Sequence, residues 1–322
     1  MTLKRKIATI FGGTGFVGRH VVKRLAAEGY TVKVATRIPE QANFLKTCGN
    51  IGQIVPFYCN YHDIASLREA VEGADIVVNC IGILFEKKKN NFARLHAELP
   101  GQIAEAAARE NVGRFVHISA LGIEQATSKY AATKRAGEVA VVNACPWATI
   151  LRPSVIFGAD DNFFNMFARL TKVAPALPLI GGGKTKFQPV FVGDVAQAVM
   201  AALLIPAIHE ADPRGKIYEL GGPEIVTLRQ IYQMVLEGTG CRRLMIPVPF
   251  FLAKIKAAFL SLMPTPLLTP DQVENMKFDN IVSPAALTLS HLGVAATGMG
   301  LVVPAYLETY KAGGRFADKK TA

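Results

Sequence analysis

The sequence lacks any uninterrupted apolar run of the roughly 18 to 20 residues that a membrane-spanning helix needs. This absence argues against a transmembrane protein. Half of the 322 residues are nevertheless hydrophobic, only 19% are charged, and the mean hydropathy is positive. This composition indicates a sizeable core, and it also indicates a large buried interface or a contact with a membrane surface.

Paired cysteine motifs are also missing. The five cysteines are odd in number and widely spaced, and none forms a Cys-x-x-Cys pair. We therefore expect free thiols in a reducing compartment, and we expect no metal site. The first apolar strand begins at about Arg5, which leaves no room for a cleaved leader, so the simplest expected location is the bacterial cytoplasm.

The net charge is +11, yet we find no nucleic-acid motif and no block of five or more basic residues. A basic surface of this kind can meet nucleic acid, anionic lipid or an acidic protein. Without a motif, we expect no nucleic-acid partner.

The first 150 residues alternate short apolar runs with helical patterns. The expected strands lie at about 6–11, 31–36, 51–60, 75–82, 114–119 and 148–153, and the expected helices at 17–30, 63–74, 92–110 and 130–144. Buried apolar strands separated by helices predict an α/β fold with a Rossmann-type doubly wound parallel sheet.

Proline and glycine become frequent after Pro153. We predict a dinucleotide-binding domain over 1–153 and a smaller C-terminal α/β substrate-type domain over 154–322. The stretch at about 187–205 is expected to return one strand and one helix to the first domain.

The stretch "FGGTGFVG" joins the first strand to the first helix and suits a dinucleotide site. Gly12 permits the tight turn, Gly15 lets amides approach a pyrophosphate, and Gly18 lets the helix pack close to the strand. The helix start adds partial positive charge. A plain glycine-rich turn is the alternative. The expected cofactor contacts here are Gly12, Gly13, Thr14, Gly15, Phe16, Val17, Gly18 and Arg19.

No acidic residue follows the second strand, where one would bind a ribose 2′-hydroxyl; Arg37 stands there instead. A guanidinium forks onto phosphate oxygens, so Arg37, joined by Arg19, favours NADP(H). Either arginine could instead be an ordinary solvent-facing side chain. Residues 60–63 are expected to face adenine, although Asp63 could be only a helix cap. Cys80, Ile81 and Gly82 are expected to line the ribose and pyrophosphate.

Tyr130 and Lys134 lie four residues apart, on one face of an expected helix. The ammonium is expected to favour the phenolate and lower the pKa of the tyrosine, and it can also reach nicotinamide ribose hydroxyls. This spacing is common by chance. Its position between the fifth and sixth strands of a sheet that carries the glycine motif favours cofactor contact.

Taken together, "FGGTGFVG", the pair Tyr130 and Lys134, and "LRPSVIFG" resemble the extended and atypical short-chain dehydrogenases/reductases. "RFVHISALG", "FQPVFVGDVAQAV", "YELGGPE" and "LTPDQVENMKFDN" resemble the branch that contains the nucleotide-binding accessory subunit of respiratory complex I and its bacterial relatives. The resemblance spans nearly the whole chain. It adds Arg152 and Pro153 to the expected cofactor contacts.

This resemblance implies tightly held NADPH that serves structure or regulation and takes no part in electron transfer. It implies peripheral-arm partners in complex I and a position at the membrane surface near the quinone region, here on the cytoplasmic face of a bacterial inner membrane. Active members place a hydroxyl residue where Ala120 stands, with Ser119 one position early. We therefore expect a protein that is not catalytic itself, in which Tyr130, Lys134 and Ser119 are catalytic candidates or remnants.

The segment Phe250 to Met263 reads as an apolar helix flanked by prolines, about 21 Å long and too short to span a bilayer. Because it is apolar nearly all round, we expect it to be buried against its own domain, a partner subunit or lipid. Lys254 and Lys256 could reach lipid headgroups.

Two other functions stay open. One is an active NADP-dependent oxidoreductase or epimerase that acts on a sugar nucleotide or a similar carbonyl or alcohol substrate through Tyr130 and Lys134. The other is a redox-sensing regulator that binds NADP(H) and docks to a partner.

Overall fold

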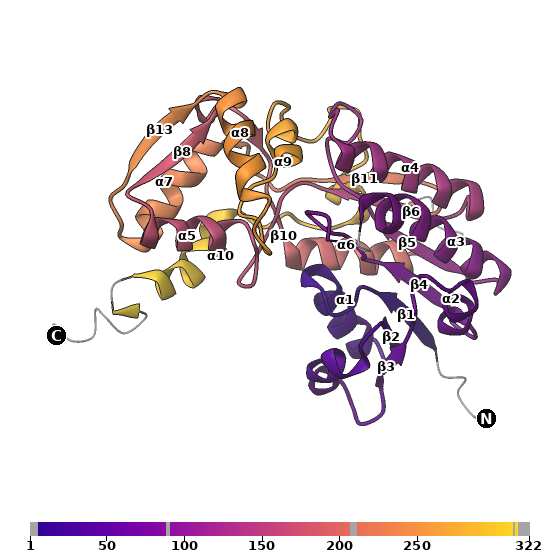
Figure 1. Ribbon diagram of the computed structural model, residues 1–322. Helices are drawn as coiled ribbons and strands as arrows, with labels where there is room; N and C mark the ends of the chain where they lie inside the picture. Colours follow the sequence, from indigo (N-terminus) through magenta and orange to yellow (C-terminus); the bar gives the residue numbers. More distant parts are fainter. Residues whose placement is uncertain (1–5, 88–90, 207–210, 312, 315–322) are drawn as a thin grey trace, which may run out of the picture.

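The computed structural model describes residues 6–87, 91–206, 211–311 and 313–314. Its centre is a seven-stranded parallel sheet in the order β11-β6-β5-β4-β1-β2-β3 (Figure 1). The strands are β1 (Ile7–Phe11), β2 (Thr31–Thr36), β3 (Ile54–Tyr58), β4 (Ile76–Asn79), β5 (Arg114–Ile118), β6 (Thr149–Pro153) and β11 (Ile217–Leu220). The predicted doubly wound parallel sheet is therefore confirmed.

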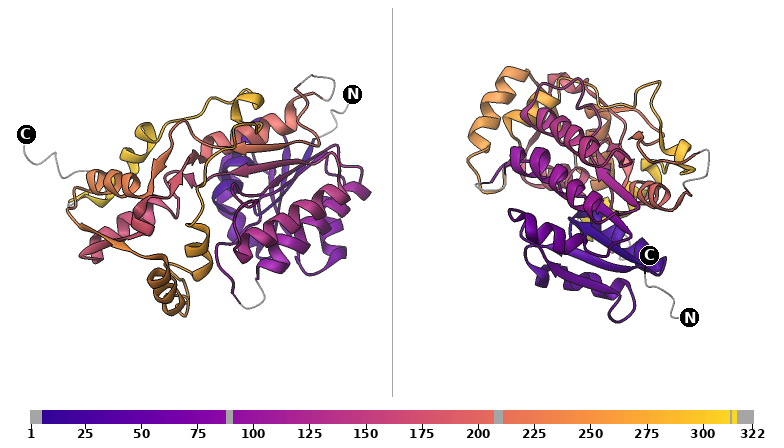
Figure 2. Two further views of the ribbon diagram at one scale, coloured as in Figure 1. Left: turned by 90° about the horizontal axis from the view of Figure 1, so that it is seen from above. Right: turned by 90° about the vertical axis from the view of Figure 1, so that its right-hand side faces the viewer.

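Helices cover both faces of this sheet (Figure 2). They are α1 (Phe16–Ala27), α2 (Ile64–Val71), α3 (Leu99–Arg109), α4 (Lys129–Ala144) and α6 (Val192–Leu204), with a 3₁₀ segment over Pro39–Cys48. One apolar core joins α1 and α6 to the sheet, and a second core joins α2, α3 and α4 to the opposite face. Helices on both faces leave the carboxyl edge of the strands as the place where loops can meet a ligand.

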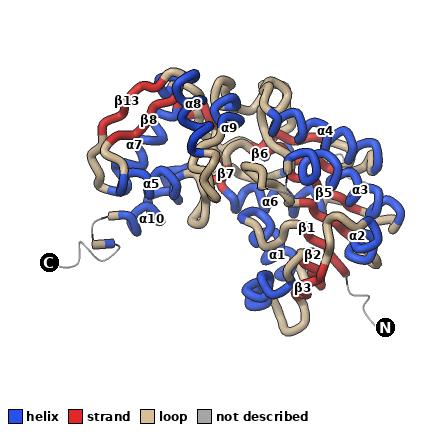
Figure 3. The backbone as a smooth tube through the Cα atoms, viewed as in Figure 1, coloured by secondary structure: helices blue, strands red, loops and turns tan. Residues whose placement is uncertain are grey.

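The remaining elements form a smaller part beside the sheet. It lies on the left in Figure 1 and in the same view in Figure 3. Its helices are α5 (Phe164–Val173), α7 (Leu228–Thr239), α8 (Phe250–Leu260), α9 (Pro270–Asn275) and α10 (Met299–Leu307). Its strands are β7 (Ile156–Phe157), β8 (Ala176–Ile180), β9 (Lys186–Phe187), β10 (Val190–Phe191), β12 (Val226–Thr227) and β13 (Leu244–Val248). An aromatic-rich core that includes Phe157, Phe164 and Tyr232 holds α5, α7 and α10 together.

The expected return of one strand and one helix of the 187–205 stretch to the first domain stays a prediction. Strand β10 pairs with β7 in a separate two-stranded sheet, so no strand of the 187–205 stretch joins the main sheet. The helix of that stretch, α6, does share the core of α1. The seventh strand is β11 instead, which pairs with β6. The division at residue 153 stays a prediction.

The helix expected over 92–110 is not uniform. A π-helix over Ala93–Glu98 precedes α3. Pro100 has no amide to donate to the carbonyl of His96, so a regular helical hydrogen bond cannot form there. That carbonyl instead faces α4, where a Cβ on Gly137 would lie 1.9 Å from the oxygen of His96.

The apolar helix is little covered by its own chain, so its expected burial against a partner subunit or lipid stays a prediction. Helix α8 buries only Ala253 and Ala257, against Val273 and Ile180. Its large side chains face outward, with Phe251 65% and Phe259 72% exposed. Within the described ranges, every helix is too short or too polar to cross a bilayer.

Candidate functional site

The glycine turn after β1 has the geometry that a phosphate site requires. Gly12 adopts φ +75°, and its carbonyl accepts a hydrogen bond from the amide of Gly15 at 3.0 Å. A Cβ on Gly18 would lie 2.2 Å from the same carbonyl oxygen, so only glycine permits this close approach of α1 to the turn. A Cβ on Gly15 would meet only that oxygen, at 3.2 Å, which leaves this side of the turn accessible to a ligand.

Two arginines flank the turn, each beside an aromatic ring. Arg37 directly follows β2, and its guanidinium lies 5.5 Å from the ring centroid of Tyr61. The guanidinium of Arg19 lies 5.8 Å from the ring of Phe44 and donates to the carboxylate of Asp160 at 3.2 Å. A phosphate at this edge would compete with Asp160 for Arg19.

The residues predicted near adenine follow β3. Asp63 is the N-cap of α2, because its carboxylate accepts from the amide of Ala65 at 3.0 Å. Asn60 and His62 line an open cavity of about 650 Å³ with Asn91, Ala93, Arg94 and Glu98. The capping role of Asp63 is thus observed, and the cavity lies beside it.

Cys80, Ile81 and Gly82 follow β4 and lie against the glycine turn. A Cβ on Gly12 would lie within 2.9 to 3.0 Å of the backbone of Cys80 and Ile81. The structure therefore brings these predicted contacts together with the glycine turn. Burial raises the pKa of the Cys80 thiol to about 12, so this cysteine is not a thiolate near neutral pH.

Helix α4 carries Tyr130 and Lys134 at the carboxyl edge of the sheet. Its N-terminus is capped twice, because Ser128 accepts from Ala131 and the Asp271 carboxylate accepts from the amides of Lys129 and Tyr130. Lys134 is 3% exposed and its ammonium donates to the carbonyl of Ile118 at 3.2 Å. Burial lowers the pKa of Lys134 to about 8, against the opposing effect of the Glu138 carboxylate.

The pKa of Tyr130 is shifted upward, opposite to the direction expected from a neighbouring ammonium. Burial, followed by the nearby Asp271 carboxylate, raises the pKa of Tyr130 to about 12. The phenol is therefore protonated near neutral pH, and it is a weaker acid than an ordinary tyrosine. Its ring meets the rings of Phe92 and His96 edge-on, with centroids 5.7 and 5.1 Å away.

Ser119 and Ala120 occupy the position where active relatives are expected to bear a hydroxyl. Ser119 is 5% exposed and its hydroxyl has no hydrogen-bond partner among the described residues. Ala120 is partly buried and packs against the small apolar cluster of Ile123, Ala126 and Ala131, which Phe278 of the C-terminal part of the chain also covers. A polar substrate atom beside Ala120 would find no hydroxyl partner on that residue.

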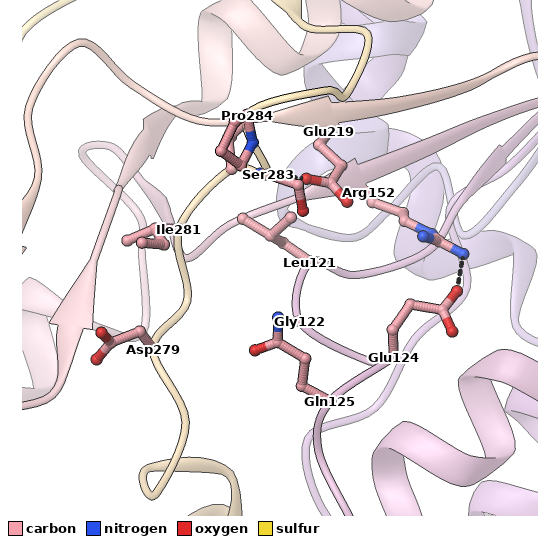
Figure 4. Close-up of a pocket in the computed structure, with 11 residues that line it drawn as sticks. Leu121, Gly122, Glu124, Gln125, Arg152, Glu219, Asp279, Ile281, Ser283 and Pro284 are labelled. Carbon is pink, nitrogen blue, oxygen red and sulfur yellow. Dashed lines mark hydrogen bonds and ion pairs between the residues drawn. The ribbon is translucent and has the colours of Figure 1, made fainter.

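Arg152 and Pro153, at the end of β6, were predicted to contact the cofactor. The Arg152 guanidinium instead forks onto the buried Glu138 carboxylate, with Nε–Oε1 at 2.9 Å and Nη2–Oε2 at 2.6 Å, and also bonds Glu124. Pro153 is buried and pairs with Leu220 of β11. Arg152 and Glu124 line a cavity of about 290 Å³. Figure 4 shows the two side chains with other residues of its lining, among them Leu121, Asp279 and Ser283.

The sequence reading missed three polar residues that lie behind the site. Asn79 of β4 and His117 of β5 are directly paired in register, and both are completely buried. His96 of the π-helix is completely buried too, and its ring stacks on Phe92. A polar side chain within each of two otherwise apolar strands was the available signal.

The residues at this edge fit a dinucleotide. Gly15 has no side chain on the accessible side of the glycine turn. The start of α1 supplies free backbone amides, and the first turn of α1 contains no acidic side chain. Arg37 directly follows β2, and the Lys134 ammonium lies near Gly82 at the same edge.

Comparisons with known proteins agree with this geometry. The sequence model of the NAD dependent epimerase/dehydratase family matches residues 8–221. The chain is 35% identical to NADH dehydrogenase [ubiquinone] 1 alpha subcomplex subunit 9, mitochondrial, of Arabidopsis thaliana, over 96% of this chain and 79% of the relative. It is 32% identical to the subunit of the same name in Mus musculus, over 92% and 78%. Among solved structures, the NADPH-dependent quinone oxidoreductase QOR2 of Escherichia coli, complexed with NADPH, matches with a TM-score of 0.71 and 20% identity, over 93% of this chain and 99% of that one.

Proposed function

The chain belongs to the NAD dependent epimerase/dehydratase family, and from that premise we propose that it is an NADP(H)-holding accessory subunit of respiratory complex I. In this proposal the nucleotide serves structure or regulation and takes no part in electron transfer. The names of the similar Arabidopsis and mouse proteins support the assignment to complex I.

The observation that carries the proposal is the apolar surrounding of Ala120, which packs against the buried cluster of Ile123, Ala126 and Ala131 in a chain whose glycine turn is intact. The turn keeps the features that bind a pyrophosphate. The hydroxyl that would stabilise a reacting oxygen is replaced by a methyl group in an apolar cluster. Loss of one such donor costs other enzymes about 3 to 4 kcal/mol of transition-state stabilisation. This combination favours a protein that holds its nucleotide without turnover.

The choice of NADP(H) over NAD(H) is part of the proposal. Arg37 supports it, because a guanidinium directly after β2 suits a 2′-phosphate, and no carboxylate stands at the end of that strand, at Thr36 or at position 37, to bind a 2′-hydroxyl. Lys134 and Tyr130 would then hold the nicotinamide ribose, and the amides of Gly15 to Gly18 the pyrophosphate.

A peripheral position on the cytoplasmic face of a bacterial inner membrane, near the quinone region of the complex, is also part of the proposal. Helix α8 supports a membrane contact, because the exposed Phe251, Ile255 and Phe259 lie beside the exposed Lys254 and Lys256. Apolar side chains that enter the interface and lysines that reach headgroups form a recurring membrane-binding pattern.

The test is native isolation from membranes in mild detergent, followed by identification of the released nucleotide and of the companion chains by mass spectrometry. We expect NADPH or NADP⁺ near one per chain, together with peripheral-arm subunits of complex I. Recovery of a free, nucleotide-empty protein would contradict the proposal.

A second candidate is an NADP-dependent oxidoreductase or epimerase, favoured by the presence of both Tyr130 and Lys134 on α4. Bound NADPH supplies a hydride in such reactions, and the tyrosine would exchange a proton with the substrate oxygen. Substrate turnover that is lost in Tyr130→Phe would establish this alternative.

A further inference from the structure

Four buried polar groups gather behind the carboxyl end of β4: the side chains of His96, His117, Ser119 and Lys134. Three of them have an atom without any hydrogen-bond partner in the described structure, namely His96 Nδ1, His117 Nε2 and the hydroxyl of Ser119. A buried donor without an acceptor costs about 1 to 3 kcal/mol, so atoms of this kind call for a ligand or for ordered water.

The neighbours of His117 determine which of its nitrogens carries the proton. The side-chain oxygen of Asn79 accepts from the amide of Ile81 at 3.0 Å, so the amide nitrogen of Asn79 is the atom that faces His117 Nδ1 at 3.2 Å. That amide donates, and Nδ1 accepts. The proton of the neutral imidazole therefore sits on Nε2, which becomes a donor without an acceptor.

The same reasoning applies to His96. Its Nε2 accepts from the backbone amide of Ile83 at 3.0 Å, so the proton sits on Nδ1. Burial, followed by the charge of Lys134, lowers the pKa of His96 to about 2 and that of His117 well below its ordinary value. Both rings are therefore neutral near pH 7, and each presents one N–H.

A single short segment places these donors together. Asn79 orients His117, Ile83 binds His96, and a Cβ on Gly82 would lie 3.7 Å from the Lys134 nitrogen. The middle of this 79–83 segment lies against Gly12 of the glycine turn. The donors thus stand directly behind the edge at which a dinucleotide would lie. An ammonium and two imidazole N–H groups form a set made of donors alone, which an oxygen acceptor would satisfy.

We propose that His96, His117 and Lys134 form a donor site for an oxygen acceptor on the nicotinamide half of the dinucleotide, a ribose hydroxyl or the carboxamide oxygen. This inference rests on the proposed function for its ligand. It assigns to two histidines a role that the tyrosine and lysine alone do not explain.

The test compares two ligands by calorimetry with the full-length, nucleotide-stripped protein. NADPH carries the nicotinamide half, whereas adenosine 2′,5′-bisphosphate carries only the phosphorylated adenosine half. In His96→Phe the ring contacts with Phe92 and Tyr130 can persist while the N–H is lost. In His96→Gln an oxygen can still accept from Ile83 and an amide can still donate. His117→Leu is the second variant.

We expect His96→Phe and His117→Leu each to weaken NADPH binding about three- to tenfold, the effect of one lost hydrogen bond. Binding of adenosine 2′,5′-bisphosphate should stay within about twofold, and His96→Gln should retain the NADPH affinity. Equal losses for both ligands would indicate a structural role and overturn the inference. Unchanged NADPH binding would mean that water satisfies these donors, which also overturns it. A wild-type protein that binds neither ligand would refute the proposed function itself.

Discussion

Arg152 and Glu138 form a bidentate ion pair in which the side chains are 11% and 7% exposed. The pair links β6 to α4, and Glu138 lies one helical turn beyond Lys134. Arg152 therefore holds the helix that carries the candidate site, and its direct contact with the cofactor stays a prediction.

Replacing Arg152 should destabilise the fold without a specific effect on the nucleotide. Arg152→Met leaves the Glu138 carboxylate buried and unpaired, which costs about 3 to 5 kcal/mol of unfolding free energy in comparable cases. Urea titration measures this loss, and the double variant Arg152→Met/Glu138→Leu should recover most of it. If Arg152→Met had normal stability but bound NADPH more weakly, the result would instead support a direct contact of Arg152 with the cofactor.

Two alanine variants separate the roles of the glycines. Gly15→Ala should fold normally, because its methyl group would approach only the Gly12 carbonyl, at 3.2 Å. It should nevertheless lose at least about tenfold in NADPH affinity, since the methyl group would stand on the side that a pyrophosphate must approach. Gly18→Ala, with its methyl group 2.2 Å from the same oxygen, should lose about 1 to 3 kcal/mol of stability. Full NADPH affinity in Gly15→Ala would place the pyrophosphate elsewhere.

Arg37 should determine the choice between the two dinucleotides. Arg37→Gln removes a charge-assisted contact to a 2′-phosphate and should weaken NADPH binding about 10- to 100-fold, while NADH binding changes little. Fluorescence titration with both nucleotides measures the ratio. Arg109→Gln, an exposed arginine at the end of α3, is the control for the loss of one positive charge. Equal loss of both nucleotides in Arg37→Gln would argue against 2′-phosphate recognition.

Lys134 should make the stability of the nucleotide-free protein depend on pH. Its pKa is about 8 in the folded chain and 10.5 in the unfolded chain, so between these values the unfolded chain binds the extra proton. Stability must then rise as pH increases from about 8 to 10.5, and the penalty for burying the charge is complete below pH 8. Lys134→Met should be roughly 3 kcal/mol more stable than the wild type at pH 7, and the difference should shrink towards pH 10.5. A pH-independent difference would mean that the buried ammonium carries no such penalty.

The exposed face of α8 should bind lipid. Phe251→Asp and Phe259→Asp place charges on the apolar face and should abolish cosedimentation with vesicles that contain anionic phospholipid. Ile51→Asp, a fully exposed position in a turn before β3, should cosediment like the wild type. Retained binding in both α8 variants would assign the membrane contact to another surface.

Local pattern was sufficient for most of the nucleotide-binding half. The β–α alternation, the glycine turn and the cap at Asp63 depend on residues close together in sequence, and the structure contains all three. The departure from expectation concerns contacts between distant segments. The pKa of Tyr130 depends on its burial and on Asp271, 141 residues later. The spacing of residues along the sequence does not predict contacts between partners so far apart.

The site was predictable as a set of loops at one edge, but its buried part was not. His96 comes from a π-helix that Pro100 imposes, and His117 acquires its orientation from Asn79 on the neighbouring strand. Both depend on a register that only the assembled sheet defines.

Strand β11 has a consequence for how the chain is made. Its four residues form the outer strand next to β6, more than sixty positions after it, and the family match ends one residue beyond it. During translation, β6 emerges from the ribosome well before β11. The outer edge of β6 in the nascent nucleotide-binding half therefore stays unpaired until β11 has been synthesised. A chain stopped at residue 153 would keep that edge exposed and would be a substrate for chaperones or for aggregation.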